Sequence, residues 1–304
     1  VALAGYLLAA RINQSAVVGE IFAGLLIGPS FLGLITYTDF VQSVAHLGAI
    51  ILLFVVGLEF KIKDVFSARY SVIALVGVIV PWIGGFLTAQ AFGYNFTNAV
   101  FTGTALTATS IAITANVLKE MGKLQTDAAR AIIGAAVMDD ILALLALSLS
   151  QHVVEGTLSI SVILTPIITA VLFLVIGLYV GNKFLSQVIE RIDKTPIGLK
   201  YPEFVFIFAM MLAFLYAMVA EMLHLSSIVG AFIAGISLEG VVTRRAKDFK
   251  EGADYLHIIF ASIFFVSLGI LVNVHVLTPA VIWFLIVLTI VAILTKVLGC
   301  FIPA

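Results

Sequence analysis

The sequence predicts an all-α membrane protein that crosses the bilayer many times, and three observations support this fold class. Hydrophobic residues make up 62% of the 304 residues, charged residues make up 11%, and the mean hydropathy is +1.21. A soluble domain has about a quarter of its residues charged. The apolar residues form long runs between short polar loops, and the basic residues fall in alternate loops. Both patterns are typical of spanning helices.

Eleven apolar segments follow one another along the chain, and each is predicted to be a helix. Their ranges are 1–10, 16–35, 43–60, 70–93, 97–118, 127–150, 158–182, 202–221, 225–240, 254–272 and 279–304. The first segment is too short to span a bilayer, because a spanning helix needs about 20 residues. We therefore expect it to be the end of a longer helix, and both ends of the chain look trimmed.

The basic residues predict the orientation of the chain. Fifteen of the sixteen lie in the loops after the first, third, fifth, seventh and ninth segments. They are Arg11, Lys61, Lys63, Arg69, Lys119, Lys123, Arg130, Lys183, Arg191, Lys194, Lys200, Arg244, Arg245, Lys247 and Lys250. The positive-inside rule makes these loops cytoplasmic and the start of the chain external. A net charge of -1 gives no reason to expect nucleic-acid binding, and the single cysteine, Cys300, excludes an intramolecular disulfide.

An internal repeat connects the two halves of the chain. Residues 15–25 match residues 226–236 at an offset of 211, and the Gly57 region matches the Gly269 region at nearly the same offset. An odd number of crossings separates the copies, so they run in opposite directions through the membrane. Inverted repeats are typical of secondary transporters; chance similarity between glycine-rich helices is the alternative. Completing the second copy would require helices beyond Ala304, so we expect about eleven of thirteen helices here.

Two adjacent carboxylates, Asp139 and Asp140, lie in the middle of segment 127–150. One aspartate at the centre of a spanning helix costs roughly 2.5–3.5 kcal/mol on insertion scales. Consecutive helix residues point about 100° apart, so both carboxylates cannot face one partner. One is expected to be structural and the other open to an ion and water, although a purely structural polar pair is the alternative.

Six hydroxyl residues lie in the middle of the fifth segment, between Thr102 and Thr114. Hydroxyls can satisfy backbone groups where a membrane helix is interrupted, and half-helix ends can then face an ion. A discontinuous crossing helix is one interpretation. A continuous helix, with the hydroxyls bonded to the preceding turn, is the other.

The remaining basic residue, Lys296, lies deep in the last segment. Its ammonium must find a carboxylate or lose its proton, unless its side chain extends to the interface. Two carboxylates and one ammonium leave one negative charge, which one monovalent cation or one proton neutralises. Competition for the same oxygens predicts exchange, and hard oxygen ligands suit sodium or lithium by analogy with divalent ions. The chain is not expected to be an enzyme or to need a cofactor.

Several stretches resemble the sodium/proton antiporters of the cation:proton antiporter-2 family, and the resemblance covers the whole chain. They are Gly134 to Leu142, Thr107 to Ser110 with Ile113 and Thr114, Val18 to Glu20 with Gly28 and Pro29, Leu53 to Glu59, and Thr295 to Gly299. The resemblance implies that Asp140 binds sodium or a proton and that Asp139 pairs with Lys296 in the ion-free state. It places Thr107, Thr109 and Ser110 at the break of the crossing helix.

The resemblance also implies a domain organisation. Residues 1–66 and 201–278 would form a scaffold, residues 67–156 and 279–304 a mobile core, and residues 157–200 the connection. The core would move like an elevator, the exchange would be electrogenic, and the protein would be a homodimer surrounded by membrane lipids. The implied location is the inner membrane of a prokaryote. Glu20 and Glu59, at segment edges on the cytoplasmic side, are expected to be helix-end carboxylates or part of an ion-entry funnel.

Three other functions are weighed against this one. A potassium efflux system of the same superfamily usually has glutamine in place of the first aspartate, so Asp139 argues against it. A sodium-coupled organic anion symporter fits less well with Lys296 and the adjacent aspartates. An intramembrane aspartyl protease needs its two aspartates on separate helices, and Asp139 and Asp140 are neighbours.

Overall fold

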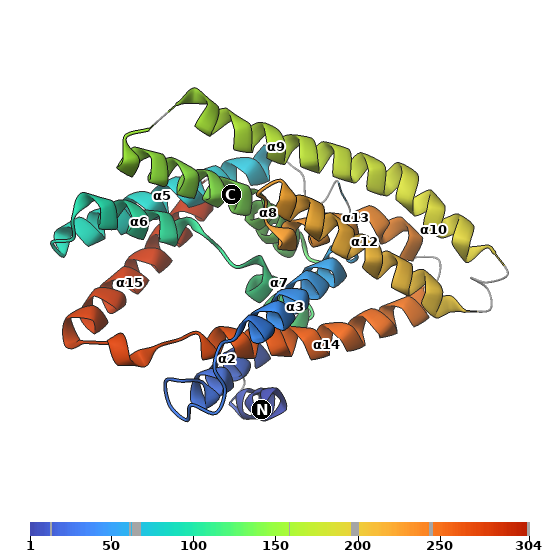
Figure 1. Cartoon of the computed structure of the whole chain (residues 1–304), viewed down its shortest axis with the longest axis horizontal. Helices are drawn as coiled ribbons and strands as arrows, with labels where there is room; N and C mark the ends of the chain where they lie inside the picture. The colour runs from blue at the N-terminus through green and yellow to red at the C-terminus, as the bar shows by residue number, and fades with distance from the viewer. Residues whose placement is uncertain are drawn as a thin grey trace.

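The computed structural model describes residues 1–12, 14–60, 62, 68–157, 159–195, 201–242 and 246–302, and in these ranges the regular structure is helical (Figure 1). The helices are α1 Ala2–Arg11, α2 Ala16–Ile27, α3 Asp39–Gly57, α5 Ala68–Ala91, α6 Phe96–Thr107, α7 Ile111–Glu120, α8 Asp127–Glu155, α9 Ile160–Tyr179, η1 Val180–Leu185, α10 Ser186–Asp193, α12 Pro202–Met222, α13 Ser227–Val242, α14 Ala246–Ile270, η2 Val274–Val276 and α15 Pro279–Phe301. Within the described residues, seven helical stretches are long and apolar enough to cross a membrane. The predicted fold class is confirmed.

Capping residues set where many of these helices begin. Thr38, Asn95, Thr126 and Thr278 each precede a helix, and each side chain accepts a hydrogen bond from a backbone N–H three residues later. Such bonds satisfy N–H groups that have no partner within the helix. The polar loop residues that separate the apolar segments therefore also define the helix starts.

The structure differs from the sequence prediction at several segment ends. The segment predicted over 16–35 ends as α2 at Ile27, because Gly28 takes an extended conformation before Pro29 and a residue before proline disfavours the helical region. The segment predicted to end at 182 continues through a π-helical turn to Asp193, and the segment predicted to start at 254 starts at Ala246. Both additional stretches are rich in charged residues, so an apolar-run criterion does not detect them.

The membrane helices pack into two groups. One, which we call the aspartate bundle, consists of α8, α5, α6 and α15, with α5 packed on the other three. The other, the repeat bundle, consists of α1, α2, α3, α12, α13 and α14. Helix α7 lies near the centre of Figure 1 and contacts α8 as well as α2 and α3. The long α9–η1–α10 helix runs along one edge and contacts both α8 and α13.

Reciprocal glycine contacts join the two sequence copies within the repeat bundle. Gly24 of α2 faces Gly269 of α14, and a Cβ atom on either would collide with the backbone of the other helix. Gly57 of α3 and Gly235 of α13 face each other in the same way. Gly235 is the repeat counterpart of Gly24, and Gly269 is the counterpart of Gly57. Each copy therefore packs its helix against the other copy, as an inverted repeat requires.

Candidate functional site

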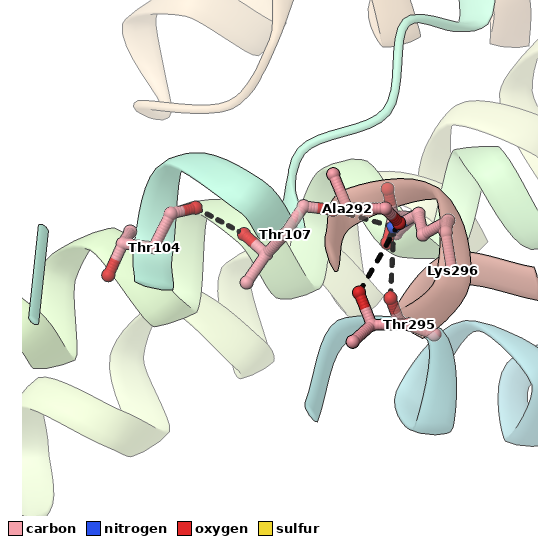
Figure 2. A network of polar contacts seen from close by, with 7 residues as sticks. Thr104, Thr107, Ala292, Thr295 and Lys296 are labelled. Atoms are coloured by element: carbon pink, nitrogen blue, oxygen red, sulfur yellow. Dashed lines mark hydrogen bonds and ion pairs between the residues drawn. The ribbon is translucent and has the colours of Figure 1, made fainter. Parts of the chain in front are cut away.

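The threonine-rich segment is interrupted between α6 and α7. Helix α6 ends at Thr107, Ala108 is extended, and α7 starts at Ile111. Ser110 caps α7, since its side chain accepts a hydrogen bond from the Ile113 N–H. Thr107 donates its hydroxyl back to the Thr104 carbonyl at 2.7 Å (Figure 2). The break leaves the Thr107 carbonyl, at the end of α6, without a helical N–H partner.

Lys296 of α15 occupies this break and is bound on three sides. Its Nζ donates to the Thr107 carbonyl at 2.8 Å, to the Gly77 carbonyl of α5 at 2.9 Å and to Asp139 Oδ1 of α8 at 3.3 Å. Figure 2 shows Lys296 beside the end of α6 that carries Thr107. An ammonium has three hydrogens to donate, and each finds an acceptor. One side chain thus connects all four helices of the aspartate bundle.

Asp139 is the buried member of the aspartate pair, with 4% of its surface exposed. Its Oδ1 pairs with Lys296, and the carboxylate also interacts with the hydroxyl and the backbone of Thr109. Asp139, Thr109 and Lys296 line one cavity of about 230 Å³, between α5, α8 and α15. A carboxylate and a hydroxyl beside a cavity supply oxygen atoms that suit a hard cation or a water molecule.

Asp140 faces the opposite side of α8, toward the repeat bundle. It interacts with the hydroxyl of Ser226, and the two line a cavity of about 10 Å³ with apolar residues of α9 and α13. Ser226 immediately precedes α13, whose free N–H groups and dipole favour a negative charge. The cavity has roughly the minimum volume that holds one water molecule. Asp139 and Asp140 therefore face different partners, as the helix geometry predicts.

Glu20 lies near the start of α2, and its side chain is buried inside the protein. Only 4% of its surface is exposed, and it accepts a hydrogen bond from Ser262 of α14. It lines a cavity of about 370 Å³ together with Asn116, Lys119 and Glu120 of α7. This polar cavity lies where α7 meets the repeat bundle.

Glu59 follows α3 and contacts the loop between α7 and α8. Its carboxylate lies 3.9 Å from Lys119 Nζ, and Gln125 donates to its backbone carbonyl at 2.9 Å. Nearby, Glu120 accepts hydrogen bonds from the Ser15 hydroxyl at 2.7 Å and from the Ala16 N–H at 3.1 Å. Polar contacts therefore join the end of α7 to the starts and ends of repeat-bundle helices.

Several residues of this site were not predicted from the sequence. Ser226 was predicted only as part of the repeat, and Gly77 was not predicted to be a partner of Lys296. A buried network also joins Trp82, Thr104 and Ser150, with the two hydroxyls 2.6 Å apart and the indole N–H 3.2 Å from Thr104. No spacing rule relates these residues, because the partners lie on different helices.

The fold and the site together define a class of protein. A multi-pass helical protein with an inverted repeat, an interrupted helix and ionisable residues inside the bundle is typical of secondary transporters. Residues 1–303 match the family model described as sodium/hydrogen exchanger, transmembrane. The chain belongs to this family of integral membrane proteins, which confirms the resemblance to sodium/proton antiporters. The electrogenic subtype stays a prediction.

Named relatives and solved structures agree with the family. The chain is 31% identical over 295 residues to the Na(+)/H(+)-K(+) antiporter GerN of Bacillus cereus, covering 96% of this chain and 74% of that relative. It is 32% identical over 302 residues to a Na(+)/H(+) antiporter of Enterococcus hirae, and the match covers 97% of this chain and 76% of that relative. The fold is similar to the sodium proton antiporter MjNhaP1 of Methanocaldococcus jannaschii, with a TM-score of 0.68, 20% identity and coverage of 99% and 76%. These relatives are antiporters rather than enzymes.

Proposed function

We propose that this protein exchanges sodium or lithium for protons across the membrane, with Asp140 as the carboxylate that binds either ion. The observation that carries the proposal is that the two aspartates have different partners. Asp139 is paired with Lys296 inside the aspartate bundle, whereas Asp140 faces Ser226 at the boundary with the repeat bundle. A site at such a boundary can be opened to either side of the membrane when one bundle moves against the other.

Charge balance explains why exchange would be coupled. Two carboxylates and one ammonium leave one negative charge, and a cation or a proton on Asp140 cancels it. A charge inside the bilayer is costly, so the neutralised site reorients with a lower barrier than the empty one. Sodium and protons therefore bind alternately to the same carboxylate oxygens. The empty site does not cross the membrane, so uncoupled ion movement is suppressed. We also propose that the exchange is electrogenic, as the resemblance implies. One cation exchanged for one proton moves no net charge, so a group other than Asp140 would have to carry a second proton for each cation.

The two bundles supply the moving parts of the proposed mechanism. The aspartate bundle together with α7 would be the mobile core, residues 67–156 and 279–304, and the repeat bundle would be the scaffold, residues 1–66 and 201–278. The α9–η1–α10 helix, within residues 157–200, would connect them. Support comes from the packing, since helices within each bundle contact one another more extensively than helices across the boundary. Thr107, Thr109 and Ser110 would form the break of the crossing helix beside the Asp139–Lys296 pair.

Three further parts of the proposal concern the surroundings of the site. The polar cavity at Glu20, with Glu59 near its edge, would be the cytoplasmic entry for ions. The basic loops would lie in the cytoplasm and the start of the chain outside, by the positive-inside rule. Of the basic loop residues, Lys61, Lys63, Lys200, Arg244 and Arg245 lie outside the described residues. The protein would act as a homodimer in a prokaryotic inner membrane.

Potassium is a second candidate cargo, because the relative GerN is named as an antiporter of potassium as well as of sodium and protons. The Asp140 carboxylate and Ser226 hydroxyl are oxygen donors that any alkali cation can use. Transport measured separately with sodium, lithium and potassium gradients distinguishes these cargoes. If only a potassium gradient drives proton movement, potassium is the transported cation in place of sodium. Asp140 would still be the carboxylate that binds it.

The experiment that tests the proposal compares two aspartates on one helix. Asp140→Asn removes the binding charge, and Asp127→Asn makes the same change at the exposed start of α8, where Asp127 pairs with Arg130 at 3.2 Å. Purified protein in vesicles is given a sodium gradient, and proton movement is followed with a pH-sensitive dye. We expect proton movement with Asp140→Asn to be no greater than in vesicles without protein. With Asp127→Asn it should equal that of the wild type.

Thermal unfolding of both variants separates a lost site from a lost fold. We expect Asp140→Asn to unfold at or above the wild-type temperature, because an amide is less costly than a carboxylate in the bundle. Sodium-driven proton movement that persists in Asp140→Asn would remove Asp140 from the role proposed for it.

A further inference from the structure

Helix α5 contains a proline in its interior, and this proline changes the hydrogen bonding of Gly77. Pro81 is four residues after Gly77 and is buried. In a regular helix the N–H of residue 81 would bond to the carbonyl of residue 77. Proline has no N–H, and its ring also pushes that carbonyl away from the helix axis. The Gly77 carbonyl is therefore released from the helix and available to another donor.

The donor that reaches this carbonyl is Lys296, at 2.9 Å. Glycines on both helices make this approach possible. A Cβ on Gly77 would lie 2.9 Å from Cys300 Sγ, and a Cβ on Gly299 would lie 3.0 Å from the carbonyl oxygen of Val76. The backbone of α15 at Gly299 therefore lies against the backbone of α5, and this close approach brings Lys296 within reach of the released carbonyl.

The Gly77 and Thr107 carbonyls play equivalent roles toward the lysine. Thr107 lacks a helical donor because α6 ends there, and Gly77 lacks one because of Pro81. Each of these carbonyls accepts one ammonium hydrogen, and Asp139 accepts the third. The ammonium thus takes the place of two missing backbone N–H groups.

We propose that Pro81 is a positioning residue for transport, which acts by holding the Lys296 ammonium against Asp139 through the released Gly77 carbonyl. The inference rests on the proposed function, because it concerns how readily Lys296 gives up Asp139 as the ion site changes its occupancy. In Pro81→Ala the helix recovers an N–H that competes for the Gly77 carbonyl, so Lys296 is held less firmly. A proline that only bends α5 would have no such connection to Lys296.

The first measurement is a double-mutant cycle on thermal unfolding, which does not depend on transport. Pro81→Ala is made in the wild type and in Lys296→Met, which keeps the side-chain bulk but has no donor. Replacing proline in a helix favours the helix by itself. In the wild type this gain is offset by the weakened lysine contact, so we expect the rise in Tm to be larger in Lys296→Met by about 2 °C or more.

The matched control is Pro166→Ala, which makes the same change inside α9, a helix that does not contain a Lys296 partner. Its effect on Tm should be the same in both backgrounds. If the gain from Pro81→Ala differs between backgrounds by less than about 2 °C, the lysine does not depend on Pro81 and the inference is wrong.

The second measurement is the pH profile of sodium-driven proton movement by the intact protein in vesicles. We expect Pro81→Ala to shift the profile by about half a pH unit or more, and Pro166→Ala to leave it in place. An unchanged profile in Pro81→Ala overturns the inference even if transport by the wild type is normal. Failure of the Asp140→Asn test, by contrast, would overturn the proposed function and leave the unfolding cycle unaffected.

Discussion

The two helix bundles of this protein both contain close glycine contacts, as at Gly299 in the aspartate bundle, but they differ in the polar contacts at their centres. The aspartate bundle is joined by polar contacts, of which the Lys296 ammonium and the Thr104–Ser150 pair are the central ones. The repeat bundle is joined by close backbone approach at glycines, as where Gly24 meets Gly269. Inside a membrane both kinds of contact can drive association, since burial of apolar surface gives little advantage over lipid.

This difference indicates that the contacts of the aspartate bundle can rearrange when an ion binds, whereas the glycine contacts of the repeat bundle stay fixed. A hydrogen-bonded ammonium can exchange one partner for another when the charge beside it changes, and the cost of each arrangement depends on bound ions. Two backbones in contact at glycines have no alternative partners and do not respond to ions. The three predictions that follow test this difference, from the largest expected effect to the smallest.

Removing the lysine should destabilise the aspartate bundle most. Lys296→Met leaves the Asp139 carboxylate buried without its cation and two carbonyls without their donor. We expect a loss of about 3 kcal/mol, the lower end for a broken buried ion pair, because 27% of the lysine side chain is exposed. Thermal unfolding of the wild type and of Lys296→Met in detergent measures this loss of stability.

The control for this prediction is the double variant Lys296→Met with Asp139→Asn. Since the uncompensated charge causes much of the loss, removing the carboxylate as well should restore more than half of it. If the double variant is as unstable as the sum of the two single variants, the ion pair is not the stabilising contact, and the contrast between the bundles weakens.

A methyl group at a glycine crossing should destabilise the repeat bundle by a somewhat smaller amount. In Gly269→Ala the new Cβ meets the backbone of α2, which cannot move aside as a flexible side chain could. We expect a loss of about 2 kcal/mol, typical of overpacking, and no dependence on salt concentration. Unfolding at low and high salt measures both.

Gly252→Ala is the matched control, on the same helix α14. A Cβ there would lie 3.7 Å from the Phe206 ring, an ordinary van der Waals contact. Its stability should equal or slightly exceed the wild type, because alanine favours the helix over glycine. Equal losses for Gly252→Ala and Gly269→Ala would mean that the crossing contributes nothing specific.

The smallest expected effect is at the edge of the polar network. Ser150→Ala removes the hydroxyl that lies 2.6 Å from Thr104 Oγ1, while Thr104 keeps its bond to the Val100 carbonyl at 2.9 Å. We expect a loss of about 1 kcal/mol, the value of one hydrogen bond. Ser148→Ala, two residues earlier on α8, is the control and should change the unfolding temperature less. A loss no larger than that of the control would show that the pair is not stabilising.

Much of the fold could be predicted from the sequence, because a bilayer requires long apolar helices and makes buried charges conspicuous. The helical class follows from local composition and the repeat from the match between two stretches of sequence. The interruption near Thr107 is one of two interpretations of the hydroxyl-rich segment, and the family resemblance favours it. The segment ends at Ile27 and Asp193 could not be predicted by the same criterion. A Gly-Pro pair ends the first of these helices before its apolar run is over, and charged residues continue the second beyond the apolar region.

The site was predictable in its residue types but not in its contacts. A lysine inside an apolar segment needs a carboxylate, and that need predicts a partner for Lys296 among the aspartates. Which helix faces Asp140, and which carbonyls accept from the lysine, depend on helix packing between distant parts of the chain. Ser226 and Gly77 are a serine before a helix and a glycine within one, and neither has a local pattern that indicates its partner.

The reciprocal packing of the two repeat copies has a consequence for biosynthesis. Gly24 of α2 meets its glycine partner on α14, and the neighbouring contact between Ser30 and Val272 joins residues 242 positions apart. At roughly 5–20 residues per second, a ribosome needs tens of seconds to make that stretch. During this time the earlier helices sit in lipid with their glycine faces uncovered, so the first half of the protein cannot complete its assembly until nearly all of this chain has been inserted.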